Sequence, residues 1–123
     1  MPAQSDIATA HEKDKPLTLR ITIGNANQGS SALFIGGVPV MKEDGTPMEF
    51  IGSFSFVLPT ARELGSRKVE INSVLSPTPG IPDPTLVLTY NIDKVNWPLN
   101  KKRTLEAQPV NGSNVFDITL KVR

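Results

Sequence analysis

The chain has no cysteine, and its single histidine, His11, lies in a polar N-terminal segment. Without cysteine there is no disulfide bond, thiolate nucleophile or cysteine-ligated metal site. A Ser-His-Asp triad or a histidine-based zinc site would need further members that this segment does not supply. The acidic residues lack the dense spacing of a calcium-binding loop. We therefore expect no catalytic residue, no metal ligand and no cofactor, and we interpret the protein as non-enzymatic.

The sequence also lacks a long apolar run and a strong net charge. No segment approaches the roughly 18 consecutive apolar residues of a membrane-spanning helix. The first seven residues have neither the basic start nor the apolar stretch of a secretory signal. The net charge of +1 gives no general attraction to nucleic acid or to an acidic membrane surface. We expect a soluble cytoplasmic protein with no membrane partner; export by another route remains an alternative.

The clearest pattern is a strict alternation at the C-terminus. Phe116, Ile118, Leu120 and Val122 alternate with polar residues, which is typical of a half-buried strand. The Asn-Gly pair at 111–112 supplies the positive-φ residues of a tight turn, and residues 104–110 can form the returning strand. The sequence therefore predicts a C-terminal β-hairpin.

Similar signals recur along the chain. The further predicted strands cover residues 17–23, 32–40, 50–58, 67–75 and 85–93. The only helical signal is a capping box formed by Thr60 and Glu63, with Gly65 as a stop. We predict an all-β fold: an antiparallel β-sandwich of about seven strands, Greek-key and immunoglobulin-like or C2-like, with at most one short helical turn near 60–65. A small barrel is the alternative. The sandwich would form a single domain over residues 16–123.

Two segments carry few strand signals. Residues 1–15 are polar and of mixed charge, so we expect a mobile N-terminal tail; the alternative is a short amphipathic helix over 5–13 that docks on a partner. Residues 76–84 contain four prolines, which exclude helix and interior strand. We interpret this segment as a rigid crossover between sheets, with a Pro-x-x-P ligand as the alternative.

The most informative polar cluster is Trp97 with the basic residues Lys94, Lys101, Lys102 and Arg103. Tryptophan and arginine often anchor protein interfaces, and a loop presents them on a rigid scaffold. One hypothesis is a protein-binding site in which the indole is buried against a partner and the cations meet its acidic groups. The other is that Trp97 folds back to cap the open end of the sandwich and the basic residues are solvated. Nucleic acid is disfavoured because its binding needs a wider basic surface.

These observations predict a protein-interaction module that uses Trp97 and the adjacent basic residues, with a protein as its partner. Two alternatives stay open: a structural or assembly subunit that self-associates through an edge strand, and a carbohydrate-binding sandwich, which would need an exposed aromatic platform. The sequence leaves the oligomeric state undetermined.

Overall fold

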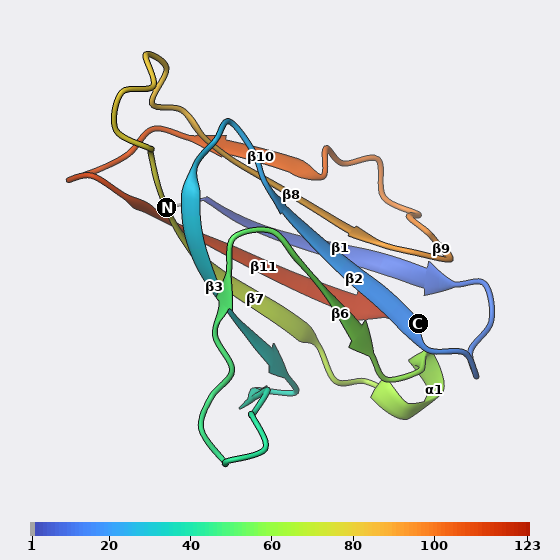
Figure 1. Ribbon diagram of the computed structural model, residues 1–123. Coiled ribbons are helices and arrows are strands. Elements are labelled where there is room, and N and C mark those ends of the chain that lie inside the picture. Colours follow the sequence, from blue (N-terminus) through green and yellow to red (C-terminus); the bar gives the residue numbers. More distant parts are fainter. Residues whose placement is uncertain (1) are drawn as a thin grey trace.

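A computed structural model describes residues 2–123 and shows a nearly all-β protein with two facing sheets (Figure 1). The elements are β1 (Ala3–Ala10), β2 (Leu17–Ile23), β3 (Gln28–Ile35), β4 (Val38–Pro39), β5 (Phe50–Ile51), β6 (Phe54–Leu58), α1 (Ala61–Leu64), β7 (Val69–Ser76), β8 (Leu86–Ile92), β9 (Val95–Asn96), β10 (Thr104–Ala107) and β11 (Asn114–Val122). The all-β class and the single short helix are therefore confirmed.

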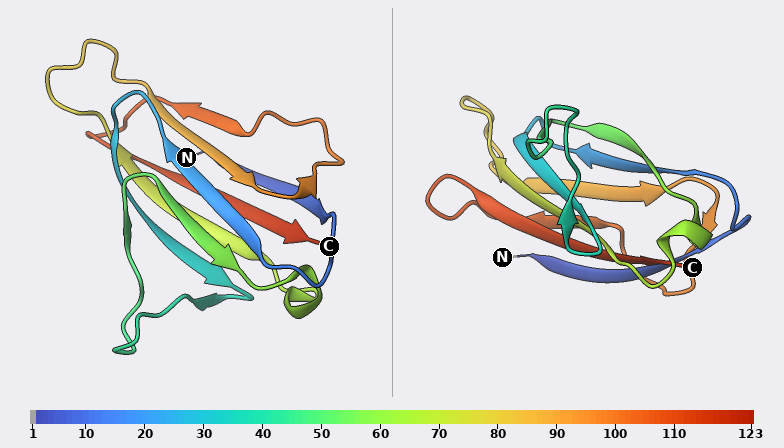
Figure 2. Two further views of the ribbon diagram at one scale, coloured as in Figure 1. Left: turned by 45° about the vertical axis from the view of Figure 1, so that its right-hand side comes forward. Right: turned by 90° about the horizontal axis from the view of Figure 1, so that it is seen from below.

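The two sheets differ in strand direction. The first has the order β4-β3-β7-β11-β1-β9, with β5 also paired to β3; the second has the order β10-β8-β2-β6. The first sheet is mixed, because β1 runs parallel to β11, whereas the second is antiparallel. Figure 2 shows β1 and β11 in one layer and β2 and β8 in the other. The arrangement is sandwich-like, but it is not purely antiparallel as predicted.

The core lies between the inward faces of these sheets. Phe116, Ile118, Leu120 and Val122 are each at most 1% exposed, which confirms the alternation predicted for the last strand. The alternating apolar residues of β2, β7 and β8 are likewise buried, with Ile23 partly so. Because successive side chains of a strand point to opposite faces, each strand supplies every second residue to this interior.

The expected mobile tail at residues 1–15 is wrong for its first part, since residues 3–10 form β1. This strand pairs with β11 along six residue pairs, from Ala3 opposite Asp117 to Ala8 opposite Val122. Its inward face carries Gln4, Asp6, Ala8 and Ala10. The segment looked unable to fold because it has few large apolar side chains, but its polar groups are satisfied by specific partners described below. The alternative helix over 5–13 is wrong for the same reason.

The predicted C-terminal hairpin is also wrong beyond its turn. Asn111 and Gly112 do have positive φ, and Val110 bridges Ser113. However, β10 pairs with β8 in the second sheet, whereas β11 pairs with β7 and β1 in the first. The Asn-Gly pair determines where the chain reverses, but it does not determine which sheet each of the two flanking strands joins.

Two predicted strands are divided by glycines. Gly36, with φ of 59°, begins the turn that separates β3 from β4, and Gly52, with φ of 70°, lies between β5 and β6. The second break places Phe50 on the first sheet and Phe54 on the second. Their rings stack with centroids 4.2 Å apart, so they help to close this side of the sandwich.

Two connecting segments, the short helix and the proline-rich loop, have the structure that the sequence predicted. Thr60 and Glu63 form both hydrogen bonds of the predicted capping box at α1. The proline-rich segment links β7 of the first sheet to β8 of the second, which confirms the crossover interpretation. At its base, the Asn25 side-chain amide donates to the carbonyl oxygens of Asp83 and Thr85. Figure 1 shows this loop projecting beyond the ends of the strands.

Candidate interaction site

The predicted site residues Trp97 to Arg103 lie in the segment between β9 and β10. Because β9 pairs with β1 in the first sheet and β10 pairs with β8 in the second, this segment crosses from one sheet to the other. It closes the side of the sandwich opposite the stacked phenylalanines. We call residues 97–103 the closing loop.

A buried carboxylate lies under this loop. The Asp6 side chain points inward from β1 and is 0% exposed. One of its oxygens, Oδ2, lies 2.9 Å from Arg103 Nε and accepts a hydrogen bond of 2.7 Å from the Tyr90 hydroxyl. Its other oxygen, Oδ1, accepts from the Ile7 backbone N–H at 2.9 Å and from Arg103 Nη2 at 3.4 Å. The Nε contact is an ion pair outside hydrogen-bond geometry, so it stabilises the buried charge by electrostatic attraction.

Arg103 uses its remaining donors to hold the closing loop. Nη1 donates to the carbonyl oxygen of Lys101 at 2.8 Å, and Nη2 donates to that of Leu99 at 2.7 Å. The guanidinium also lies 4.4 Å from the centroid of the Trp97 ring, which is cation–π distance. Arg103 therefore links β1, the loop backbone and the indole, and its Nη1 and Nη2 groups already donate hydrogen bonds within the chain.

Trp97 packs back onto the sandwich. Its ring meets the Tyr90 ring edge-on, with centroids 5.8 Å apart and an interplanar angle of 74°. Its Nε1 donates a long hydrogen bond of 3.4 Å to Asn91 Oδ1. With Arg103 against one face and Tyr90 at its edge, the indole is half-buried and has limited surface left for a partner.

Two further residues of β1 join the network. Gln4 Nε2 donates to the Tyr90 hydroxyl at 2.6 Å and to the Lys102 carbonyl oxygen at 2.7 Å. Lys101 Nζ donates to the carbonyl oxygen of Ser5. Sequence reasoning missed Gln4 and Asp6 because both lie in the segment interpreted as a tail. Their placement two residues apart was the one available signal, since it puts them on the same face of a strand.

The electrostatics of the network favour a protonated phenol. Burial raises the pKa of Tyr90 well above its ordinary value, and the hydrogen bond that it donates to Asp6 raises this pKa further. The phenol therefore stays a donor to Asp6 at neutral pH.

The middle of the closing loop faces solvent. Pro98, Leu99, Asn100, Lys101 and Lys102 are all exposed, and Leu99 is 37% exposed. The structure thus brings four of the five predicted site residues into one loop, with Trp97 and Arg103 at its fixed ends.

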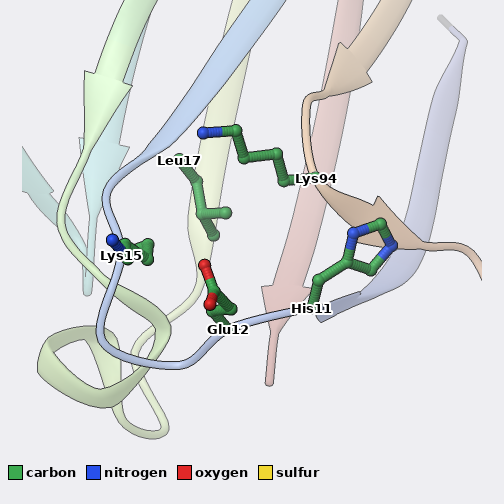
Figure 3. A pocket seen from close by; sticks show the side chains of 5 residues that line it. All are labelled: His11, Glu12, Lys15, Leu17 and Lys94. Atoms are coloured by element: carbon green, nitrogen blue, oxygen red, sulfur yellow. The ribbon is translucent and has the colours of Figure 1, made fainter.

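Lys94 lies apart, in the tight turn between β8 and β9, with φ of 63°. It lines a hollow of about 280 Å³ together with His11, Glu12, Lys15 and Leu17. Figure 3 shows the Lys94 side chain extending over this hollow while the His11 ring lies to one side. His11 Nε2 is 3.2 Å from Asn96 Oδ1, and the mixed charges around the hollow select no particular ligand.

Over residues 2–123, no three His, Asp or Glu side chains come close enough together to hold a metal ion. No helix in this part of the chain has the length and apolar character needed to cross a membrane. Comparison of the chain with protein-family models, with curated protein sequences and with solved structures finds no significant match.

Proposed function

We propose that the protein is a non-enzymatic interaction module that binds a protein partner through the closing loop. The observation that carries the proposal is that the loop is fixed at both ends but exposed in its middle. Trp97 and Arg103 are held by Tyr90 and Asp6, whereas Leu99 and its neighbours face solvent. A loop already held in one conformation loses less entropy when it binds, so more of its contact energy becomes affinity.

The exposed residues suggest the chemistry of the partner. Pro98 and Leu99 offer a small apolar surface, and Lys101 and Lys102 offer positive charge, whereas Lys94 lies apart at the hollow near His11. A complementary segment would place an apolar side chain against Leu99 and acidic residues against the lysines. In this proposal Trp97 and Arg103 are positioning residues, because their main contacts lie within the chain.

The test uses substitutions in the exposed middle of the loop that leave the buried network intact. Extract from source cells would be passed over the wild type and over a Leu99→Ser, Lys102→Glu variant, and any captured protein would then be purified and its affinity measured. The proposal places both residues at the centre of the interface, where the residues whose loss costs more than about 1 kcal/mol are concentrated. We therefore expect a loss of affinity of about tenfold or more.

The matched control is Lys42→Glu, which makes the same charge change in the loop after β4, at the opposite edge of the first sheet. Equal affinities for the wild type and the loop variant, or an equal loss in the control, would contradict the proposal.

The two alternative functions, self-association and carbohydrate binding, would need other surfaces of the molecule. Self-association through an edge strand could use β6 or β10 of the second sheet, or β4 and the part of β1 that β9 leaves uncovered in the first. The strands β6 and β10 are only five and four residues long, and Pro59 directly follows β6. Light scattering at several concentrations tests this alternative. Carbohydrate binding would need an open aromatic face, and the Trp97 ring has Arg103 over it.

The finer fold assignment, a Greek-key sandwich of the immunoglobulin-like or C2-like kind, is part of the same proposal. Its support is that the connections from β2 to β3, from β6 to β7 and from β7 to β8 each cross between the two sheets. The proposal also keeps the cytoplasmic location expected from the sequence.

A further inference from the structure

A groove on the outer side of β1 gathers three lysines from separate parts of the chain. It has a volume of about 230 Å³, and the residues that matter for its chemistry are Lys68, Lys101, Lys121, Ser5, Thr119 and Leu99. It lies outside the mixed-charge hollow near His11, with which it shares no lining residue.

Strand register explains why these residues meet. Ser5 lies opposite Thr119 and Ile7 lies opposite Lys121 in the parallel pairing of β1 with β11. Leu120 lies opposite Val69 in the pairing of β11 with β7, so Lys68, which precedes Val69, comes beside Lys121. Lys101 arrives from the closing loop across the free edge of β1, where its Nζ donates to the Ser5 carbonyl oxygen.

The positive charge of the groove is not neutralised by the chain itself. Over residues 2–123, none of the three lysines has a carboxylate oxygen within ion-pair distance. Asp6 also lines the groove, but its charge is met by Arg103 and Tyr90. Two further acids lie near the groove: Glu70, opposite Thr119 on β7, and Asp117, two residues before Thr119 on the outward face of β11. Neither forms an ion pair with these lysines.

We propose that this groove binds a phosphate group. Three ammonium groups favour a dianion over a monoanion, because the attraction grows with the charge of the ligand. Lysine is a compact point charge that suits phosphate oxygens, and the Ser5 and Thr119 hydroxyls add hydrogen-bond donors. The volume is below that of a pocket for a drug-sized molecule, so it suits one such group with a short body. The phosphate is either free or the ester of a small molecule whose aliphatic part lies against Ile7 and Leu99.

The probe experiment is an NMR titration of backbone amides at pH 7.5. Inorganic phosphate and sulfate, both mainly dianions, are expected to give saturating shifts at Ile7, Thr119 and Lys121. Acetate and chloride at matched ionic strength are expected to give no saturation. Butyl phosphate separates the two sources: tighter binding than inorganic phosphate indicates an ester, and equal or weaker binding indicates free phosphate.

Variants test the assignment to these residues. Lys68→Gln and Lys121→Gln should each weaken phosphate binding about fivefold, as expected for loss of one exposed charge pair of about 1 kcal/mol. Lys42→Gln, with the same change at the opposite edge of the sheet, should bind like the wild type. Circular dichroism would verify that each variant is folded.

Three results would overturn the inference: shifts that do not saturate, shifts that chloride reproduces, or an equal loss of binding in Lys42→Gln. The groove shares Leu99 and Lys101 with the closing loop, but the variants used here change only Lys68 and Lys121, which lie outside the loop, so this test and that of the proposed protein partner succeed or fail separately.

Discussion

Replacing Arg103 with methionine should strongly destabilise the protein, because it leaves the buried Asp6 carboxylate without its counter-ion. Methionine keeps much of the aliphatic length of arginine but removes the charge and all the donors. The Asp6 side chain is 0% exposed and that of Arg103 is 20% exposed. The carboxylate would retain only the Tyr90 hydroxyl and the Ile7 N–H.

The magnitude follows from burial. Removing one partner of a buried ion pair typically costs about 3–5 kcal/mol of unfolding free energy. An unfolding entropy of about 2.1 cal/mol/K per residue gives about 0.26 kcal/mol/K for the chain, so Tm should fall by roughly 12–19 °C. Loss of the cation–π contact with Trp97 adds to this cost.

Arg20→Met provides a matched control. Arg20 lies 2.9 Å from Asp93, the same separation as in the buried pair, but the side chains are 53% and 38% exposed. An exposed pair contributes about 0–1 kcal/mol, so this variant should be nearly as stable as the wild type.

The assays are urea unfolding for the free energy and thermal unfolding for Tm, both at pH 7. Both are followed by far-UV circular dichroism, which does not depend on Trp97 fluorescence. A double variant, Asp6→Leu with Arg103→Met, should recover much of the loss, because removing both charges leaves no uncompensated ion. If Arg103→Met costs no more than Arg20→Met, the reasoning about Asp6 is refuted.

Three other predictions concern the sheets and the helix cap. Leu120→Ala, at a fully buried position, should cost about 2–5 kcal/mol in urea unfolding, and an unchanged curve would contradict the placement of β11. Thr60→Ala, which removes the side-chain cap of α1, should cost about 1 kcal/mol in the same assay, whereas a neutral effect would mean that the cap adds no stability. Tyr90 is the only tyrosine, so ultraviolet absorbance reports it alone, and it should ionise well above pH 10 in the folded protein. Because its folded-state pKa is raised above the unfolded value near 10, its contribution to stability is complete below about pH 10 and declines as the pH rises further; Tyr90→Phe should lack this decline, and a phenol that titrates near 10 would contradict its burial.

The parts of the fold that the sequence predicted rest on local chemistry. Strict alternation placed the inward faces of β2, β8 and β11, because a period of two leaves one arrangement that buries the apolar set. The capping box at Thr60 depends on residues three apart in sequence. The proline-rich segment could only be a connection, since proline lacks the backbone donor that an interior strand needs.

The parts that the sequence did not predict depend on contacts between distant residues. Nothing near Asp6 in sequence shows that Arg103 and Tyr90 will meet it, 97 and 84 positions away. Without those partners β1 looks too polar to fold. The pairing of β10 with β8 was missed for a related reason, because the turn at Asn111 does not specify which sheet each strand joins.

The sequence predicted which residues form the candidate site but not what each of them contacts. The sequence left two interpretations of Trp97 open, an interface anchor and a cap on the open end of the sandwich. The contacts of its ring with Tyr90 and Arg103 agree with the cap. Lys101 and Lys102 are exposed beside Trp97 and Arg103, as a protein-binding loop requires. The sequence shows which residues gather in the closing loop. Their roles depend on Asp6 and Tyr90, which lie under the loop and come from distant parts of the chain.

The most direct test of the account is hydrogen exchange at the amide of Ala10, the residue through which β1 donates to the Arg123 carbonyl oxygen at 2.7 Å. The account predicts that this amide is protected to a degree similar to the amides shared by β7 and β11, because β1 belongs to the same sheet. Exchange of Ala10 at the rate of an unstructured peptide, with β7 and β11 still protected, would show that residues 3–10 are a tail and would remove the support for the closing loop.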